Sequence, residues 1–221
     1  MGTVTFVRHG QASFGSADYD HLSPLGERQC EALGEYLAQR GRRFDAVMRG
    51  ALRRHRQSLE AISRGLPGLP EAIEWPGLNE YDGEALVRAL LGELPKVDTR
   101  EGYKKHFRVL REALGAWMEG RIAPAGMPSW PGFVEGVTSA LEHIRTHHEG
   151  DVLVVSSGGP ISTAVAHVLG APGAAMIELN MRLRNSALTE FVGTRAGHAL
   201  SGFNAVPHLD LPGRDEWITW A

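Results

Sequence analysis

The sequence predicts an α/β fold, a three-layer α/β/α sandwich with a mostly parallel central sheet. Two observations carry this prediction. Residues 3–7 (TVTFV) and 151–155 (DVLVV) are short, β-branched apolar runs that end near glycine, which is typical of buried strands. Longer segments with helical periodicity alternate with such runs along the chain, and this alternation is typical of a parallel sheet covered by helices.

The remaining elements are expected in the same alternating order. Residues 22–27 (LSPLGE) open a helix that runs to about residue 40, because Ser23 is a suitable N-cap and Pro24 fits the first helical position. Further helices are expected at residues 52–64, 103–118, 133–147 and 161–169, and further strands at 44–48, 73–75, 187–192 and 200–203. Residues 11–21 are interpreted as a polar loop.

The chain is interpreted as one domain, residues 1–221, that carries a helical insertion. Between about residues 86 and 126 no segment reads as a strand, whereas the sequence keeps helical periodicity. We expect this segment to form a cap over the active edge of the sheet rather than a separate domain. A homodimer is left open by the sequence.

The composition is that of an ordinary globular protein, with 43% hydrophobic and 22% charged residues. The net charge of −3 argues against a broad nucleic-acid surface, so the basic cluster at residues 53–56 is interpreted as a solvated or phosphate-facing helix start. No run approaches the roughly 18 apolar residues of a membrane span. A single cysteine, Cys30, excludes an internal disulfide and fits a cytoplasmic location, and no signal peptide is recognised.

The tetrapeptide Arg8-His9-Gly10-Gln11 follows the first predicted strand directly. Open α/β sheets bind their ligands at the carboxyl ends of strands. An arginine binds a phosphoryl group through its fork of donors, and a histidine offers a nitrogen nucleophile to phosphorus. The pair therefore indicates phosphoryl chemistry, although Arg-His-Gly alone would not establish it.

Five further segments complete a pattern with this tetrapeptide. They are LSPLGERQ at residues 22–29, LRRHRQSLEAI at 52–62, LNEYDGE at 78–84, VVSSGGPI at 154–161 and RNS at 184–186. In this order and spacing, and together with VRHGQ at 7–11, they resemble the histidine phosphatase superfamily, in its phosphoglycerate mutase-like branch. The resemblance covers most of the chain outside the insertion.

The resemblance implies a role for each of four residues. His9 would be the nucleophile that forms a phosphohistidine, and Arg8 and Arg54 would clamp the phosphoryl group. Glu80 would be the acid that gives its proton to the leaving oxygen, with Asp82 and Glu84 as nearby alternatives for this role. The family chemistry requires no metal and no organic cofactor, and the sequence shows no metal-ligand spacing.

The sequence departs from the family where a second histidine usually follows the strand at 151–155. Ser157 stands in that position, and serine can donate one hydrogen bond but carries no charge. The backbone of Gly158 and Gly159 could replace the missing donor with an anion-binding nest, and Arg49 and Arg184 are two further candidates at even odds with a surface role. Ser157 is not itself interpreted as a nucleophile, because the G-x-S-x-G pattern is absent.

A second departure follows the first motif. Mutases of this family usually carry an asparagine after Arg-His-Gly, but residues 12–15 read ASFG, so Gln11 and Ser13 are the remaining polar candidates. We therefore expect a phosphatase that acts on a small phosphorylated substrate beneath the insertion. A catalytically weak, phospholigand-binding or regulatory protein is the alternative, and a phosphoglycerate-type mutase is disfavoured. Cys30 and His208 are expected to pack, and His147-His148 to be solvated.

Overall fold

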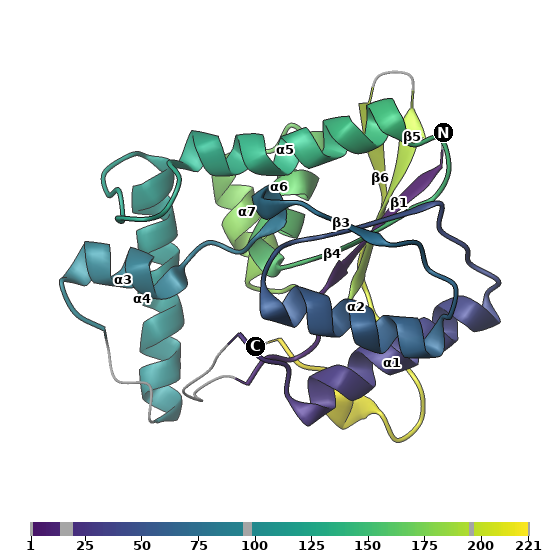
Figure 1. The fold of residues 1–221 in the computed structure, drawn as a ribbon. Coiled ribbons are helices and arrows are strands. Elements are labelled where there is room, and N and C mark those ends of the chain that lie inside the picture. Colours follow the sequence, from purple (N-terminus) through teal and green to yellow (C-terminus); the bar gives the residue numbers. More distant parts are fainter. Residues whose placement is uncertain (1, 14–19, 95–98, 195–196, 221) are drawn as a thin grey trace.

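In the computed structural model, which describes residues 2–13, 20–94, 99–194 and 197–220, a six-stranded sheet forms the centre (Figure 1). Its strand order is β3-β2-β4-β1-β5-β6. The strands are β1 (Thr3–Arg8), β2 (Ala46–Arg49), β3 (Ala72–Glu74), β4 (Val152–Ser156), β5 (Leu188–Thr194) and β6 (Gly197–Ala205). The first four are mutually parallel, whereas β5 and β6 run antiparallel at one edge. The predicted α/β class and mostly parallel sheet are confirmed.

Helices cover both faces of this sheet, as the three-layer prediction requires. They are α1 (Pro24–Gln39), α2 (Arg53–Gly65), α3 (Gly83–Leu91), α4 (Arg100–Met118), α5 (Trp130–His147), α6 (Gly158–Val168) and α7 (Gly173–Asn180). Helices α1 and α2 lie together on one face, and α5 and α6 lie on the other (Figure 1). Among the described helices, none has the length and hydropathy needed to cross a membrane.

Side chains that alternate along β1 build the two halves of the core. Phe6 is fully buried with the helices α3 to α7, where its ring makes an edge contact with Phe191. Val7 is buried on the opposite face, among side chains of α1 and α2 such as Cys30 and Leu33. Because both faces of β1 and β4 are covered, these strands read as continuous apolar runs in the sequence.

Two helices that the sequence analysis did not assign are α3 and α7. Helix α7 follows Pro172 and spans only eight residues with apolar side chains on several faces, so it has no clear helical period. Helix α3 begins after Asp82, whose carboxylate accepts a hydrogen bond from the Ala85 amide. The predicted loop at 11–21 and the predicted insertion at 86–126 are each described except for residues 14–19 and 95–98.

We expect Leu153→Ala to lower the free energy of unfolding by about 2–5 kcal/mol, because the side chain is fully buried between β4 and the α1–α2 layer and its loss leaves a cavity. Urea denaturation followed by circular dichroism measures this change. The matched control is Leu169→Ala at the end of α6, where the side chain is 58% exposed and we expect a change within about 0.5 kcal/mol. Equal effects at the two positions would contradict the layer assignment.

Candidate active site

The carboxyl ends of β1 and β4 lie side by side and bring the first and fifth sequence motifs together. Arg8 is paired with Ser156 in the parallel register, and the His9 amide donates to the Ser156 carbonyl at 2.8 Å. His9 is therefore the first residue beyond β1, and Ser157 is the first beyond β4. Both side chains are buried, so the predicted nucleophile and the serine that replaces the second histidine share one site.

The ring of His9 is held in a defined orientation. Its Nδ1 lies 2.7 Å from the carbonyl oxygen of Gly10, so Nδ1 carries the hydrogen and donates it. That tautomer leaves Nε2 with a free lone pair. Burial, followed by the positive charges of Arg54 and Arg8, holds the pKa of His9 well below its usual range. The ring is thus neutral, and one nitrogen is available as a nucleophile near neutral pH.

Gly10 gives the loop after β1 its close approach to helix α1. A Cβ atom on Gly10 would lie 2.3 Å from the Gly26 carbonyl oxygen, and one on Gly26 would lie 2.2 Å from the Gln11 carbonyl oxygen. Neither position can carry a side chain without moving backbone. The Gly10 amide also donates to Ser58 Oγ at 3.1 Å, which ties the loop to α2.

Arg8 and Arg54, the two arginines predicted to clamp the phosphoryl group, are both buried. Arg8 Nη1 donates to the carbonyl oxygens of Leu183 and, at 2.6 Å, of Trp220 near the end of the chain. Arg54 Nη1 forms an ion pair with Asp20 Oδ1 at 2.9 Å. The positive charges of both guanidiniums help to lower the pKa of His9.

Glu80 is the acidic residue that enters the site. The Gly159 amide, in the first turn of α6, donates to its Oε1 at 3.0 Å and its Oε2 at 3.1 Å. Burial raises the pKa of Glu80, while the Gly159 amide and the charges of Arg54 and Arg8 oppose this effect. The two alternatives, Asp82 and Glu84, are exposed, and Asp82 caps α3 instead.

Ser157 is the N-cap of α6 in position, but its side chain does not cap the helix. Its Oγ lies 2.7 Å from Nε2 of His55, the third residue of α2, and both residues are fully buried. Gly158 begins the helix next to Glu80 and Asn180, where a Cβ atom would lie 2.2 Å from Asn180 Oδ1. The positive end of α6 therefore points into the site.

Two residues of the site were missed by the sequence analysis, His55 and Asp20. His55 stands directly after Arg54 in the motif RRHRQS, and its ring centre lies 5.9 Å from that of His9. Because this helix start was predicted to face phosphate, a histidine within it could have been identified from the sequence as a candidate site residue. Asp20 also accepts hydrogen bonds from the amides of Arg53 and Arg54, and thereby caps α2, whose own N-cap residue Leu52 has no capping side chain.

The other predicted phosphate contacts have partners elsewhere in the protein. Arg49 pairs with Glu74 at 2.8 Å and donates to the Gly50 carbonyl. The guanidinium of Arg184 is bonded to Asn204, and Gln11 Oε1 accepts from the hydroxyl of Ser23. These contacts use Gln11 Oε1 as an acceptor and Arg49 Nη1 as a donor, so the prediction that Arg49 or Gln11 binds phosphate stays a prediction.

The histidines and the cysteine predicted to lie outside the chemistry are placed as expected except for His148, which was expected to be solvated but is half-buried, with its Nε2 covered. His208 is buried against Ser186 Oγ at 2.8 Å, and burial lowers the pKa of His208 to about 3. His147 is exposed, and Cys30 is packed in the core beneath α1, where burial raises the pKa of its thiol to about 11. Among the described residues, no three metal-ligand side chains gather in a way that could hold a metal ion.

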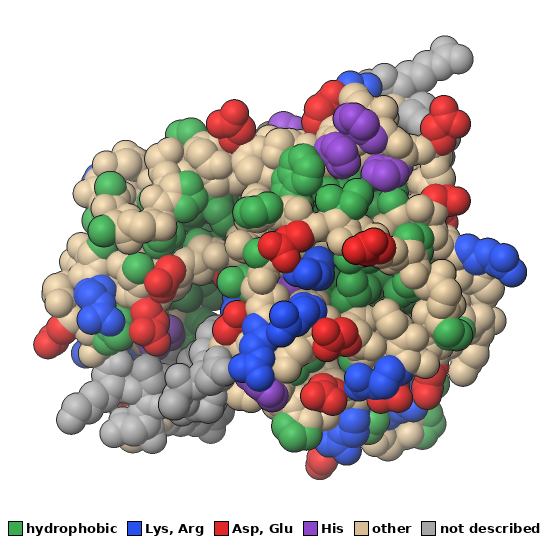
Figure 2. Space-filling model, in the orientation of Figure 1, with side chains coloured by type: hydrophobic (Ala, Val, Ile, Leu, Met, Phe, Trp, Pro, Cys, Tyr) green, Lys and Arg blue, Asp and Glu red, His purple; other side chains and the backbone are tan. Residues whose placement is uncertain are grey.

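The molecular surface near α2 carries charges of both signs. Arg53 and Arg56, the first and fourth residues of α2, are exposed, and Arg56 pairs with Glu60 one turn later. Figure 2 shows basic and acidic side chains intermingled over this part of the molecule. Residues 53–56 lie at the start of α2, as the sequence predicted for this basic cluster.

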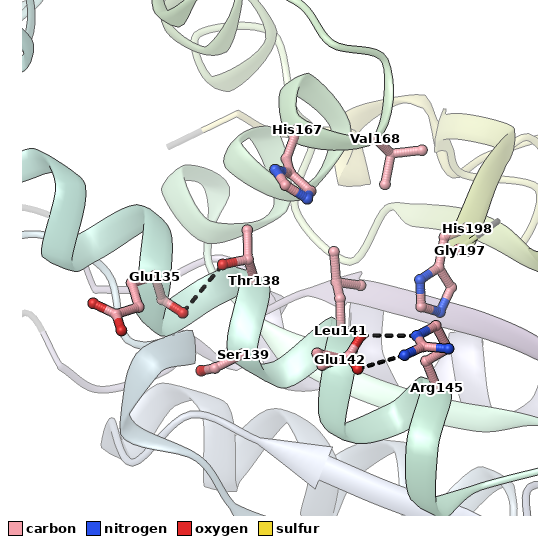
Figure 3. A pocket seen from close by; sticks show the side chains of 10 residues that line it. All are labelled: Glu135, Thr138, Ser139, Leu141, Glu142, Arg145, His167, Val168, Gly197 and His198. Carbon is pink, nitrogen blue, oxygen red and sulfur yellow. Dashed lines mark hydrogen bonds and ion pairs between the residues drawn. The ribbon is translucent and has the colours of Figure 1, made fainter.

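Two clefts lie outside the cluster around His9. One, of about 270 Å³, borders Glu80 and Tyr81 and is closed on the other side by Met127 and Phe133. The second, of about 790 Å³, opens between α5, α6 and the start of β6, and contains none of the predicted site residues (Figure 3). Its floor is occupied by the Arg145–Glu142 ion pair. Of these two clefts, the smaller one adjoins the candidate site through Glu80.

The sequence of this protein matches the model of the histidine phosphatase superfamily (branch 1) over residues 4–206. The chain belongs to this superfamily. No curated protein matches the sequence significantly.

Solved structures of several phosphatases share the fold. Phosphoserine phosphatase from Entamoeba histolytica is 19% identical, with a TM-score of 0.68 over 95% of this chain and 100% of that one. A mycobacterial glucosyl-3-phosphoglycerate phosphatase is 20% identical, with a TM-score of 0.67 over 94% and 99%. The alpha-ribazole phosphatase from Shigella flexneri is 19% identical, with a TM-score of 0.64 over 92% and 96%. At these identities the likeness defines the fold.

Proposed function

We propose that this protein is a phosphatase that hydrolyses a small phosphomonoester through a phosphohistidine on His9. The observation that carries the proposal is the state of His9, a neutral and oriented ring with Nε2 unprotonated, whose pKa is lowered by burial and by the charges of Arg54 and Arg8. Membership in the histidine phosphatase superfamily supports the same chemistry. The structural neighbours named above are phosphatases of phosphomonoesters, so this substrate class is the one we test first.

The reaction proceeds in two steps. In the first, His9 Nε2 attacks phosphorus, the bond from phosphorus to the leaving oxygen breaks, and Glu80 gives that oxygen its proton. In the second, Glu80 takes a proton from water, the water oxygen bonds to phosphorus, and the bond to His9 breaks. Arg8 and Arg54 stabilise the charge that spreads over the three equatorial oxygens in both steps.

The segment that would select the substrate is the predicted cap. Helix α3 begins two residues after Tyr81, and the ring of Tyr81 contacts Trp117 of α4 and Phe133 of α5. Figure 1 shows α3 and α4 next to each other, to one side of the sheet. The aromatic contacts of Tyr81 connect these helices to the loop that carries Glu80, so a substrate that reaches His9 would pass α3 and α4.

The test is turnover of a panel of phosphomonoesters in the presence of EDTA, with p-nitrophenyl phosphate as the general substrate. We expect phosphate release without added metal. We also expect a phosphoryl group on the peptide that contains His9 after rapid quenching at alkaline pH, where phosphohistidine persists. Binding of inorganic phosphate without turnover of any substrate would reject the enzyme in favour of a phospholigand-binding protein. Isomer interconversion stimulated by a bisphosphate would indicate a mutase.

Gly159→Ala is expected to lower kcat by about 10²-fold. A Cβ atom at this position would lie 2.1 Å from Glu80 Oε1 and 2.7 Å from the Tyr81 ring, so the acid must move by the order of 1 Å. Steady-state kinetics measures the loss. The matched control is Gly115→Ala in α4, which has open space at its Cβ and should keep full activity while gaining about 0.5–1 kcal/mol of stability. Full activity of the Gly159 variant would contradict the role of Glu80.

A further inference from the structure

The family resemblance predicts a histidine at position 157, and the structure has in its place a buried pair, Ser157 and His55. The two residues are 102 positions apart in sequence, one in α2 and the other at the start of α6, and their Nε2 and Oγ atoms are 2.7 Å apart. Neither is accessible to solvent. The site thus contains a second imidazole, that of His55, and its ring centre lies 5.9 Å from the ring centre of His9. This imidazole comes from α2 rather than from position 157, where the family resemblance predicts it.

Small residues on both sides make room for the His55 ring. Ser157 is one of them, and Gly50 is the other, because a Cβ atom on Gly50 would lie 2.3 Å from His55 Nδ1 and 2.7 Å from its Cε1. Nδ1 is buried beside the Gly50 backbone and makes no hydrogen bond of ordinary geometry there. The contact with Ser157 is therefore the well-formed hydrogen bond of this ring.

We propose that His55 and Ser157 act together as the phosphate-contacting group opposite His9, with His55 positioning the Ser157 hydroxyl and Ser157 donating to a phosphoryl oxygen. This proposal rests on the proposed phosphatase function. Serine has one hydrogen to donate. It reaches a phosphoryl oxygen only when the ring Nε2–H donates to Oγ, so the histidine fixes the direction of the serine proton. His55 is thus a positioning residue, and Ser157 is the group that touches substrate.

The electrostatics of the pair agree with a neutral donor. Burial, then the charges of Arg54 and Arg49, hold the pKa of His55 well below its usual range. A neutral imidazole still donates through one N–H. The cation that the family's second histidine would supply is then replaced by a hydrogen-bond relay, beside the two guanidiniums already in the site.

A double-mutant cycle tests the proposal. We expect His55→Ala and Ser157→Ala each to lower kcat/KM by about 10²-fold, the usual cost of removing one preorganised donor. Because the histidine acts through the serine, the double variant should lose no more than the larger single loss, within about threefold. Multiplicative losses would overturn the relay and show that the two residues act separately. Thermal unfolding of each variant separates loss of folding from loss of the contact.

Moving the imidazole from position 55 to position 157, here called the transplant, tests whether kcat/KM can be recovered. A purely structural role of His55 would give no such recovery. Ser157→His alone should fail, since the new ring would occupy the place of His55. The combination of His55→Ala with Ser157→His moves the imidazole to position 157, and we expect it to recover at least tenfold in kcat/KM over His55→Ala. Gly50→Ala displaces the ring without altering either residue, and its Cβ would also lie 2.8 Å from Asn79 Oδ1, so its loss should be at least as large as that caused by His55→Ala. A transplant as inactive as His55→Ala, although folded, would overturn the proposal.

A binding measurement keeps this inference separate from the proposed function. If the wild-type protein binds orthovanadate but turns over no substrate, the phosphatase assignment fails. The affinity for orthovanadate, measured by calorimetry, still tests the pair. We then expect a loss of at least tenfold in His55→Ala and in Ser157→Ala, again without further loss in the double variant. Unchanged affinity in both single variants would reject the pair.

Discussion

His9→Ala is expected to abolish phosphatase turnover, with a loss of at least about 10⁴-fold in kcat, because the substitution removes the oriented ring nitrogen that would form the covalent intermediate. Neither p-nitrophenyl phosphate nor an alkyl phosphate should be hydrolysed. Mass spectrometry should find no phosphoryl group on the variant. Retained binding of orthovanadate would show that Arg8 and Arg54 still hold an anion when the nucleophile is gone.

The control for this variant must show that the loss of a histidine outside the site leaves both folding and activity unchanged. His147→Ala serves both purposes, because His147 is exposed at the end of α5 and lies outside the site. We expect wild-type kinetics for it. Circular dichroism and thermal unfolding should show His9→Ala to be folded. Turnover by His9→Ala within tenfold of wild type would refute covalent catalysis on this residue.

Glu80→Gln is expected to lower kcat by about 10²–10⁴-fold for an alkyl phosphate and far less for p-nitrophenyl phosphate. The reason is the leaving group. An alkoxide needs the proton that Glu80 carries, whereas nitrophenolate leaves without one. Comparing the two substrates therefore isolates proton donation from any general disturbance of the site. An equal loss on both substrates would assign Glu80 to positioning rather than to acid catalysis.

The dependence of kcat/KM on pH provides a second test of the roles of His9 and Glu80. His9 must be unprotonated, and its lowered pKa extends activity toward acidic pH. Glu80 must be protonated, and its raised pKa extends activity toward neutral pH. We expect a bell-shaped kcat/KM profile between these limits. The alkaline limb due to Glu80 should disappear in Glu80→Gln, whereas titration of the substrate phosphate remains common to both proteins.

The parts of the fold that the sequence could predict are those with strong local patterns. The runs at 3–7 and 151–155 match β1 and β4 within one residue, because both strands are buried on both faces. Helix α1 begins at Pro24, as its Ser23 cap and the proline indicate. Helix α7 could not be predicted in this way, since its stability comes from packing against α6 and α4 rather than from a periodic sequence.

The candidate site likewise contains residues that local sequence reveals and a contact that only the folded chain reveals. Residues that follow a strand, such as His9 and Ser157, are recognisable from local sequence. The hydrogen bond between Ser157 and His55 joins two segments whose side chains meet only after β2 and β4 pair and α2 packs beside them. A missing histidine in one motif and an extra histidine in another look like two independent departures until the fold brings them together.

The contact between Arg8 and the Trp220 carbonyl bears on how this protein is handled in the laboratory. Gln29 also holds this end of the chain, through the Trp217 carbonyl and the Thr219 hydroxyl. A sequence fused behind Trp220 would emerge beside Arg8, to which the proposed function assigns phosphate binding, and a flexible affinity tag there could compete with substrate. The amino end lies at the opposite end of β1 (Figure 1), so tags and surface linkages belong there.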